Sequence, residues 1–229
     1  MRRTVVVLVA LIFVAVGEAR AQAVADQKLW LSGAAEIPLT EAVRADVGGT
    51  LRAGADSGYD QLRLDTGLSF RASGYLGFAA GYSYMLRDGS PALDTVDDTR
   101  HRLTGDVKLR ARPGRLELSY RARLQLTTSE VDSTRLHLRN KVAVGYQASK
   151  RLTPYLAFEG IHLLDPVAEY RESRFYLGVD VRVDRRFELG VYYLRQVETN
   201  VSRPEENHVL GLDLTYLVRR GGKAKRAAD

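Results

Sequence analysis

Cysteine is absent from all 229 residues of the chain. This absence excludes a disulfide framework, a thiolate metal site, a cysteine nucleophile and an anchor built on a lipid-modified cysteine. Proline is scarce, and the 6 prolines and 20 glycines exclude collagen-like and low-complexity linker classes. Hydrophobic residues make up 45% and charged residues 27%, an ordinary balance that predicts a folded chain of one domain or at most two.

Familiar catalytic and cofactor motifs are also missing. The chain has no G-x-G-x-x-G, no G-x-x-x-x-G-K-[ST], no H-E-x-x-H and no G-x-S-x-G pattern. Asp94, Asp97 and Asp98 lie close together, but their spacing matches no known calcium loop. We therefore predict no metal ion and no cofactor.

Charge of one sign is concentrated at the two ends of the chain. Residues 1–21 carry a net charge of +2 and residues 219–229 a net charge of +4. Together they account for the total of +6, so residues 22–218 are neutral overall. The high isoelectric point therefore does not indicate nucleic-acid binding, and we predict no nucleic-acid partner.

The first residues have the three parts of a secretory signal. Arg2 and Arg3 precede an apolar run from Val5 to Val16, and Ala19-Arg20-Ala21 supplies an A-x-A cleavage pattern. The run is shorter than the ~20 residues of a membrane-spanning helix, and no later segment approaches that length. We predict that residues 1–21 are a signal peptide for export, with a retained anchor helix as the alternative.

Strict alternation of apolar and polar residues dominates the rest of the chain. In residues 174–184, for example, Phe175, Leu177 and Val179 share one face while Arg174 and Asp180 share the other. A period of two is the signature of β-strands. Eleven segments show it: 27–37, 42–53, 61–71, 75–86, 101–111, 115–126, 135–147, 154–163, 174–184, 187–197 and 208–218.

The connections between these segments alternate in length. Short ones lie at 72–74, 113–114, 149–151 and 184–186, and longer polar ones at 54–60, 87–100, 127–134, 164–173 and 198–207. Bacterial outer-membrane barrels have this asymmetry and usually an even strand count. We predict an all-β fold over residues 22–218, an antiparallel up-and-down transmembrane β-barrel of ten to twelve strands with twelve slightly favoured. Short turns and the basic tail 219–229 would be periplasmic and longer loops extracellular.

Alternation alone does not decide which face of such a barrel meets water. A soluble periplasmic ligand-binding barrel would point its apolar face inward, and a membrane barrel would point it at lipid. Strand length, loop asymmetry and tyrosines on the apolar face favour lipid. Residues 211–216 are also similar to the C-terminal signal read by the outer-membrane assembly machinery. We therefore expect that machinery and outer-membrane lipid as partners, and we leave the oligomeric state open.

Seven short motifs follow one another along the mature chain. They are Trp30-Leu31-Ser32, Gly81-Tyr82-Ser83-Tyr84, Arg100-His101-Arg102-Leu103, Leu118-Ser119-Tyr120-Arg121-Ala122-Arg123, Leu138-Arg139-Asn140-Lys141, residues 153–159 (TPYLAFE) and Asn207-His208-Val209-Leu210-Gly211. In these motifs the chain resembles the uncharacterised bacterial family catalogued as domain of unknown function 2490. The resemblance implies a small outer-membrane β-barrel and transfers no activity.

The polar face would line the lumen, with both signs of charge and an excess of arginine. Paired charges there could form a salt-bridged plug or a narrow passage that prefers anions, so we predict a structural role or a role in small-solute passage. The residues expected to line the lumen are Arg63, Asp65, Arg102, Asp106, Arg110, Arg121, Arg123, Arg139, Glu159, Arg174, Asp180 and Arg182.

A lipid-modifying enzyme is the remaining alternative. The predicted topology places all four histidines, His101, His137, His162 and His208, near the extracellular rim, where imidazole could act as a general base. Hydroxyl candidates lie in the predicted loops at Ser129, Ser133, Ser173 and Ser202. Nothing in the sequence fixes a serine–histidine pair, so we assign no catalytic residue.

Overall fold

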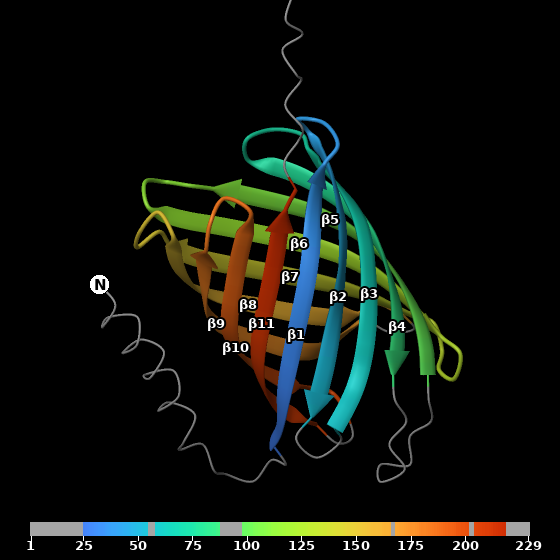
Figure 1. The fold of residues 1–229 in the computed structure, drawn as a ribbon. Coiled ribbons are helices and arrows are strands. Elements are labelled where there is room, and N and C mark those ends of the chain that lie inside the picture. Colours follow the sequence, from blue (N-terminus) through green and yellow to red (C-terminus); the bar gives the residue numbers. More distant parts are fainter. Residues whose placement is uncertain (1–24, 55–57, 88–97, 166–167, 202–203, 219–229) are drawn as a thin grey trace, which may run out of the picture.

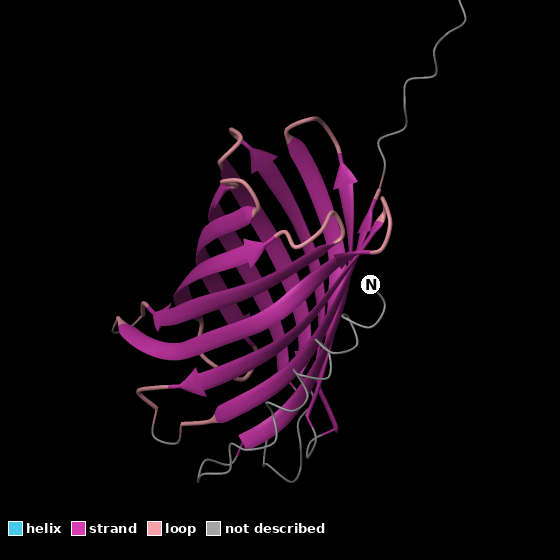
Figure 2. Cartoon of the chain, turned by 90° about the vertical axis from the view of Figure 1, so that its left-hand side faces the viewer, coloured by secondary structure: helices cyan, strands magenta, loops and turns pink. Residues whose placement is uncertain are grey.

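The computed structural model describes residues 25–54, 58–87, 98–165, 168–201 and 204–218. The predicted signal peptide, the basic tail 219–229 and the aspartates Asp94 and Asp97 lie outside these residues. The described residues form strands, turns and loops without a helix (Figure 2), and none of them belongs to a helix long and apolar enough to cross a membrane.

Eleven strands account for most of the described chain. They are β1 (Ala25–Pro38), β2 (Val43–Gly54), β3 (Gly58–Arg71), β4 (Leu76–Arg87), β5 (Asp98–Ala111), β6 (Leu116–Ser129), β7 (Arg135–Tyr146), β8 (Leu152–Leu163), β9 (Glu169–Arg182), β10 (Phe187–Glu198) and β11 (Glu206–Leu217). Each predicted segment corresponds to one of these strands.

The strands form a closed barrel in chain order (Figure 1). Each strand pairs antiparallel with the next, but β1 closes the barrel against β11 in parallel, with Trp30 opposite Gly211. The predicted all-β barrel of ten to twelve strands is confirmed, but the preference for twelve strands and for antiparallel pairing throughout is wrong. In an up-and-down chain an odd number of strands makes the last run in the same direction as the first, so the closing pair must be parallel.

Two ends of the barrel differ in their connections. At the turn end the strands are joined by residues 39–42, 72–75, 112–115, 147–151 and 183–186, and at the loop end by residues 55–57, 88–97, 130–134, 164–168 and 199–205. All five loop-end connections are shorter than predicted because the strands continue beyond the apolar alternation. Ladder hydrogen bonds join backbone groups and do not require apolar side chains.

Side chains and special backbone geometry close the turns. Thr40 Oγ1 accepts from the amide of Val43 at 2.9 Å, and Asp184 Oδ1 accepts from the amide of Phe187 at 2.8 Å. The amide of Leu116 donates to the carbonyl of Pro113 at 3.2 Å, and Gly114, the second residue of this turn, has a φ of 62°, the positive value that a type II′ turn places at this position and that favours glycine. These local contacts satisfy backbone groups where the ladder ends.

The barrel carries its apolar side chains on the outside. Among the described residues 33 large hydrophobic side chains are exposed, whereas nine hydrophobic residues are buried. Glu159, by contrast, points inward and is completely buried. This arrangement is the reverse of that in a water-soluble barrel, whose apolar face fills the interior.

An aromatic cluster fills one wall of the interior. Trp30, Tyr192, Leu194 and Val209 pack together, with Tyr155 and Tyr176 against them. The ring of Tyr192 lies directly over Gly211, so that a Cβ there would be 2.0 Å from the ring. The wall built by β1 and β8–β11 therefore carries the aromatic cluster, together with charged residues of the same strands such as Glu159 and Arg174.

Candidate functional site

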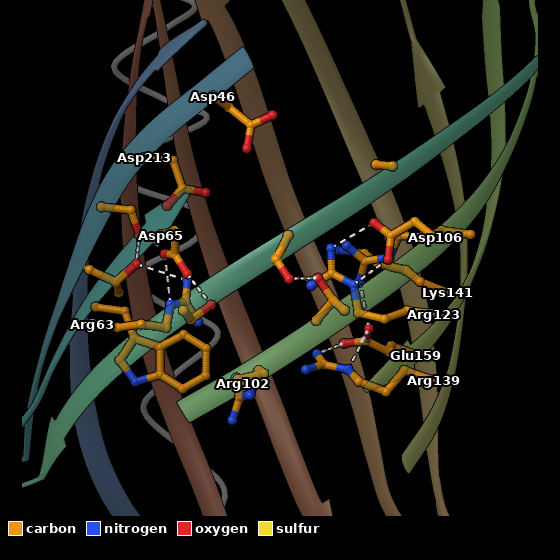
Figure 3. Close-up of a pocket in the computed structure, with 18 of the residues that line it drawn as sticks. Asp46, Arg63, Asp65, Arg102, Asp106, Arg123, Arg139, Lys141, Glu159 and Asp213 are labelled. Atoms are coloured by element: carbon orange, nitrogen blue, oxygen red, sulfur yellow. Dashed lines mark hydrogen bonds and ion pairs between the residues drawn. The ribbon is translucent and has the colours of Figure 1, made fainter. Parts of the chain in front are cut away.

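The lumen contains two cavities of about 360 and 200 Å³. Nine of the twelve predicted lumen residues line the larger cavity (Figure 3): Arg63, Asp65, Arg102, Asp106, Arg121, Arg123, Arg139, Glu159 and Arg174. The other three, Arg110, Asp180 and Arg182, lie on the inward side of the alternation toward the turn end and line neither cavity.

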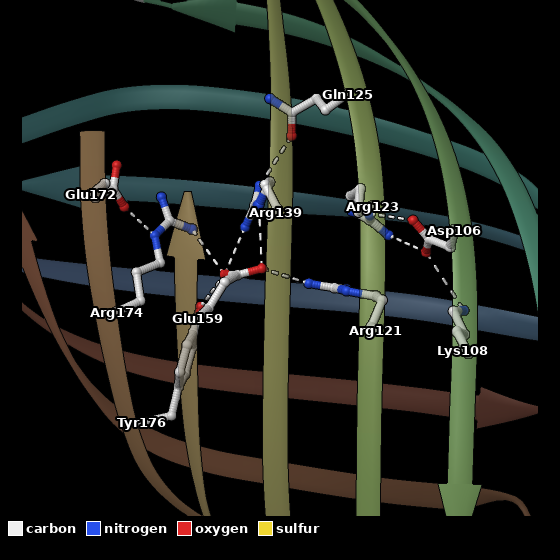
Figure 4. Close-up of polar contacts among 10 residues, drawn as sticks. All are labelled: Asp106, Lys108, Arg121, Arg123, Gln125, Arg139, Glu159, Glu172, Arg174 and Tyr176. Carbon is white, nitrogen blue, oxygen red and sulfur yellow. Dashed lines mark hydrogen bonds and ion pairs between the residues drawn. The ribbon is translucent and has the colours of Figure 1, made fainter. Parts of the chain in front are cut away.

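Glu159 on β8 is the centre of the densest charge cluster (Figure 4). Its carboxylate accepts hydrogen bonds from Arg121 at 2.8 Å and from Arg139 at 2.8 and 3.2 Å. Tyr176 donates to it at 3.1 Å, and a guanidinium nitrogen of Arg174 lies 3.9 Å away. Three arginines from β6, β7 and β9 are thereby tied to one carboxylate.

A second cluster lies on β5 and β6. Arg123 donates two hydrogen bonds to Asp106, at 2.6 and 2.7 Å, in the fork geometry that guanidinium and carboxylate share. The ammonium group of Lys108 lies 3.8 Å from the same carboxylate (Figure 4). This cluster carries one more positive than negative charge.

Asp65 on β3 organises a third group. It accepts from Arg63 at 2.8 Å and from the hydroxyl of Ser83 at 2.6 Å. Arg63 also donates to Thr50 at 3.0 Å, which links β2, β3 and β4 across the lumen face. Arg63 and Asp65 carry opposite charges, so this ion pair is neutral overall.

Acidic side chains gather toward one end of the larger cavity. Asp46 on β2 and Asp213 on β11 both lie toward that end, and Arg102 and Arg139 lie toward the other end (Figure 3). On the wall between them, the ammonium group of Lys141 sits 3.8 Å over the ring of Tyr176. The lumen therefore has an acidic part and an arginine-rich part.

Arg52 on β2 was not among the predicted lumen residues. Its guanidinium stacks 4.0 Å over the indole of Trp30 and donates to Gln61 at 3.2 Å. It alternates with Leu51 in the same way as the arginines that were predicted, so the period-two pattern was sufficient to find it. The role of Trp30 as an inward partner had no such signal, because a tryptophan suits either face.

The four histidines do not gather at one site. His137 lines the smaller cavity, whereas His101, His162 and His208 lie on the outward side of the alternation. The Nδ1 atom of His101 lies 2.7 Å from the hydroxyl of Tyr82, and that of His208 lies 2.5 Å from the hydroxyl of Tyr193.

The predicted loop serines are engaged elsewhere. Ser129 donates to Asp98 at 2.7 Å, and Ser173 bonds the hydroxyl of Tyr170 at 2.6 Å. The backbone amide of Ser133 donates to the carboxylate of Asp132. Ser202 lies outside the described residues. No serine–histidine hydrogen bond is recorded among the described residues. One histidine, His208, has both a hydroxyl partner and a carboxylate, Glu206, 3.4 Å from its Nε2.

The part of the chain that the structure describes contains no candidate metal site. No group of three or more histidine, aspartate and glutamate side chains is placed there to hold an ion. The polar groups of the lumen are arranged to bind one another through charge-assisted hydrogen bonds.

Fold and site together define a closed β-barrel with an apolar exterior and a charged interior. Residues 27–207 match the family described as "Protein of unknown function (DUF2490)", and the chain belongs to this family. No curated protein sequence matches the chain. Among solved structures, the translocator domain of autotransporter NalP from Neisseria meningitidis is similar at 13% identity and a TM-score of 0.46, over 90% of this chain and 92% of that one.

Proposed function

We propose that this protein is an outer-membrane β-barrel whose exterior contacts lipid and whose lumen provides a narrow passage for small solutes. The observation that carries the proposal is the inverted distribution of side chains, with 33 large hydrophobic residues exposed and a carboxylate, Glu159, fully buried. An exposed apolar surface of this extent is unstable in water and stable in a bilayer. The same observation argues against the soluble periplasmic barrel.

Aromatic residues on the exterior support the placement in a membrane. Tyrosine and other amphipathic rings favour the two bilayer interfaces, and aliphatic residues favour the centre. Toward the turn end the outward residues are Phe70, Tyr75, Phe78, Tyr146, Phe187 and Tyr216. Toward the loop end they are Tyr82, Tyr84, Tyr193, His101 and His208, four of which form the two tyrosine–histidine pairs Tyr82–His101 and Tyr193–His208. Leucine and valine occupy much of the band between them.

The lumen supports passage of small solutes more than passage of large ones. Barrel width grows with strand number, so an eleven-stranded barrel is intermediate in width. An eight-stranded barrel is filled by its side chains, and a sixteen-stranded barrel leaves an aqueous channel. The clusters around Glu159, Asp106 and Asp65 hold long side chains against the wall. The cavities that remain are polar, so water and small ions suit them better than apolar ligands.

Export and assembly complete the proposal. The signal-like residues 1–21 would direct the chain to the periplasm, and residues 211–216 would be read by the outer-membrane assembly machinery. With short turns in the periplasm, the loop end faces outward from the cell.

Cell fractionation and a pair of arginine variants test the placement in lipid. The protein should sediment with outer membranes and migrate heat-modifiably on gels. Leu124→Arg, on the exposed face of β6, should cost ~2–4 kcal/mol because the guanidinium would enter the bilayer. Ser119→Arg, on the inward face of the same strand, should cost less. The free energy of unfolding is measured by urea titration in lipid vesicles, and equal costs on the two faces would overturn the proposal.

Planar-bilayer recording tests the passage itself. Folded protein should produce small, discrete single-channel currents because the lumen is narrow. A bilayer that contains correctly folded, heat-modifiable protein but carries no current would leave a plugged barrel with a structural role.

A further inference from the structure

Four arginines stand at the junction of the two cavities. Arg52, Arg102, Arg139 and Arg174 line both the larger and the smaller cavity. They come from β2, β5, β7 and β9, so they approach the lumen from different sides of the barrel. A solute at the boundary of the two cavities would therefore lie beside these four arginines.

Positive charge is in excess at this point. The smaller cavity is lined by six arginines, the four above with Arg100 and Arg135, against two carboxylates, Asp132 and Glu172. Arg100 bonds Asp98, Arg135 bonds Asp132, Arg174 bonds Glu172, and Arg139 bonds Glu159. Arg52 and Arg102 have only neutral acceptors recorded among the described residues, Gln61 and Thr127, each at 3.2 Å.

Two hydrogen-bond donors on the same wall lack an acceptor among the described residues. They are Nε1 of Trp30, whose side chain is only 7% exposed, and Nε of Arg52, whose guanidinium stacks on that indole. Both residues line the larger cavity. Because buried donors without partners cost free energy, this wall is suited to a ligand that brings acceptor oxygens.

We propose that the junction of the two cavities is a binding site for a compact oxyanion of the phosphate type, held by Arg52 and Arg102 with Arg139 and Arg174 beside them. Guanidinium groups present paired donors that match the oxygens of phosphate or carboxylate. The smaller cavity, at about 200 Å³, lies below the range of ~300–1,000 Å³ typical of drug-sized ligands, so the part of a ligand that enters it must be a small group. The site rests on the proposed function for its route of access, but binding itself requires no passage.

Trp30 provides a built-in reporter for this site, since it is the only tryptophan in the chain. Its fluorescence is recorded for the full chain folded in detergent micelles at constant ionic strength. Iodide should quench it more strongly than caesium, because the guanidinium groups attract anions. Inorganic phosphate should then alter the emission saturably and protect Trp30 from iodide.

Variants separate a specific site from general positive charge. Arg102→Gln should keep the contact with Thr127, remove the charge and weaken phosphate binding about tenfold, because a charge-assisted hydrogen bond is lost. Arg102→Lys keeps the positive charge but loses the paired donors of the guanidinium, so its phosphate affinity should lie between those of the wild type and Arg102→Gln. Arg182→Gln is the matched control, since this exposed arginine pairs with Glu188 and lines neither cavity, and its phosphate affinity should be unchanged.

The anions themselves form the second arm of the experiment. Glycerol phosphate and acetate, compared with inorganic phosphate, distinguish a phosphate ester, a carboxylate and a free phosphate as the preferred source. Non-saturable quenching, or equal loss of affinity in Arg102→Gln and Arg182→Gln, would overturn the site. Saturable phosphate binding without bilayer current would keep the site and refute the passage, so that the two proposals fail separately.

Discussion

Glu159 is the most enclosed charged side chain among the described residues, and its position shows what holds the lumen together. It is completely buried and is shared by Arg121, Arg139 and Arg174. One carboxylate thus offsets part of the repulsion among three arginines, and it accepts hydrogen bonds from two of them, Arg121 and Arg139. Removing one partner of a buried ion pair is costly because the other charges remain uncompensated.

We expect Glu159→Gln to lower the free energy of unfolding by about 3 kcal/mol. This value lies at the lower end for a buried pair, because Arg121 keeps 26% of its side chain exposed and can be hydrated. Urea unfolding in detergent micelles measures it. Glu188→Gln, which breaks the exposed pair with Arg182, should cost less than ~1 kcal/mol. Equal shifts in the two variants would contradict a structural role for the cluster.

Alternation predicted most of the charged site, because inward and outward residues differ in polarity along every strand. Asp106 and Arg123, for example, were placed on the inner face by this pattern alone and pair there. The pattern could not predict how far along the lumen each residue lies, which depends on strand tilt and register. Arg182 was therefore expected in the lumen but lies near the turn end, exposed beside Glu188.

Strands β10 and β11 show how glycine and tyrosine shape a strand pair. Tyr192 and Gly211 are direct cross-strand partners, and the tyrosine ring covers the glycine from the lumen side. Gly178 on β9 is covered in the same way by Tyr155 of β8. The missing side chain of each glycine gives an aromatic ring room to lie flat against the strand.

Gly211→Ala should destabilise the barrel by about 1–3 kcal/mol, because the new Cβ would lie 2.0 Å from the ring of Tyr192 and force it to move. Gly33→Ala is the matched control on the neighbouring strand β1, where no atom lies within 4 Å of a built Cβ. Its effect should stay within about 0.5 kcal/mol. Unfolding midpoints in the same detergent compare the two. If Gly211→Ala were as stable as Gly33→Ala, the tyrosine would not pack against the glycine as described.

Strand positions were predictable from the sequence, but the closure of the barrel was not. Eleven alternating segments were counted, and each became a strand. The general preference for even numbers nevertheless favoured twelve. Alternation reports which residues face inward and says nothing about which strands pair, so the parallel contact between β1 and β11 had no local signal.

At the scale of the whole molecule, the odd strand number places the start of the first strand and the finish of the last strand at opposite ends of the barrel. β1 begins at the loop end and β11 finishes at the turn end (Figure 1). In an even-stranded barrel the first strand begins and the last strand finishes at the same end. If the loop end faces outward from the cell, the start of β1 lies at the cell surface and the finish of β11 lies in the periplasm.

Epitope insertion tests this separation. An epitope placed directly before Ala25 should bind antibody on intact cells, as should one placed in the loop-end segment 199–205. An epitope in the turn-end segment 147–151 should bind only after the outer membrane is permeabilised. Correct folding of each insertion is checked by heat-modifiable migration. An epitope before Ala25 that is protected together with the one in 147–151 would require an even number of membrane crossings, and the parallel β1–β11 closure would then be wrong.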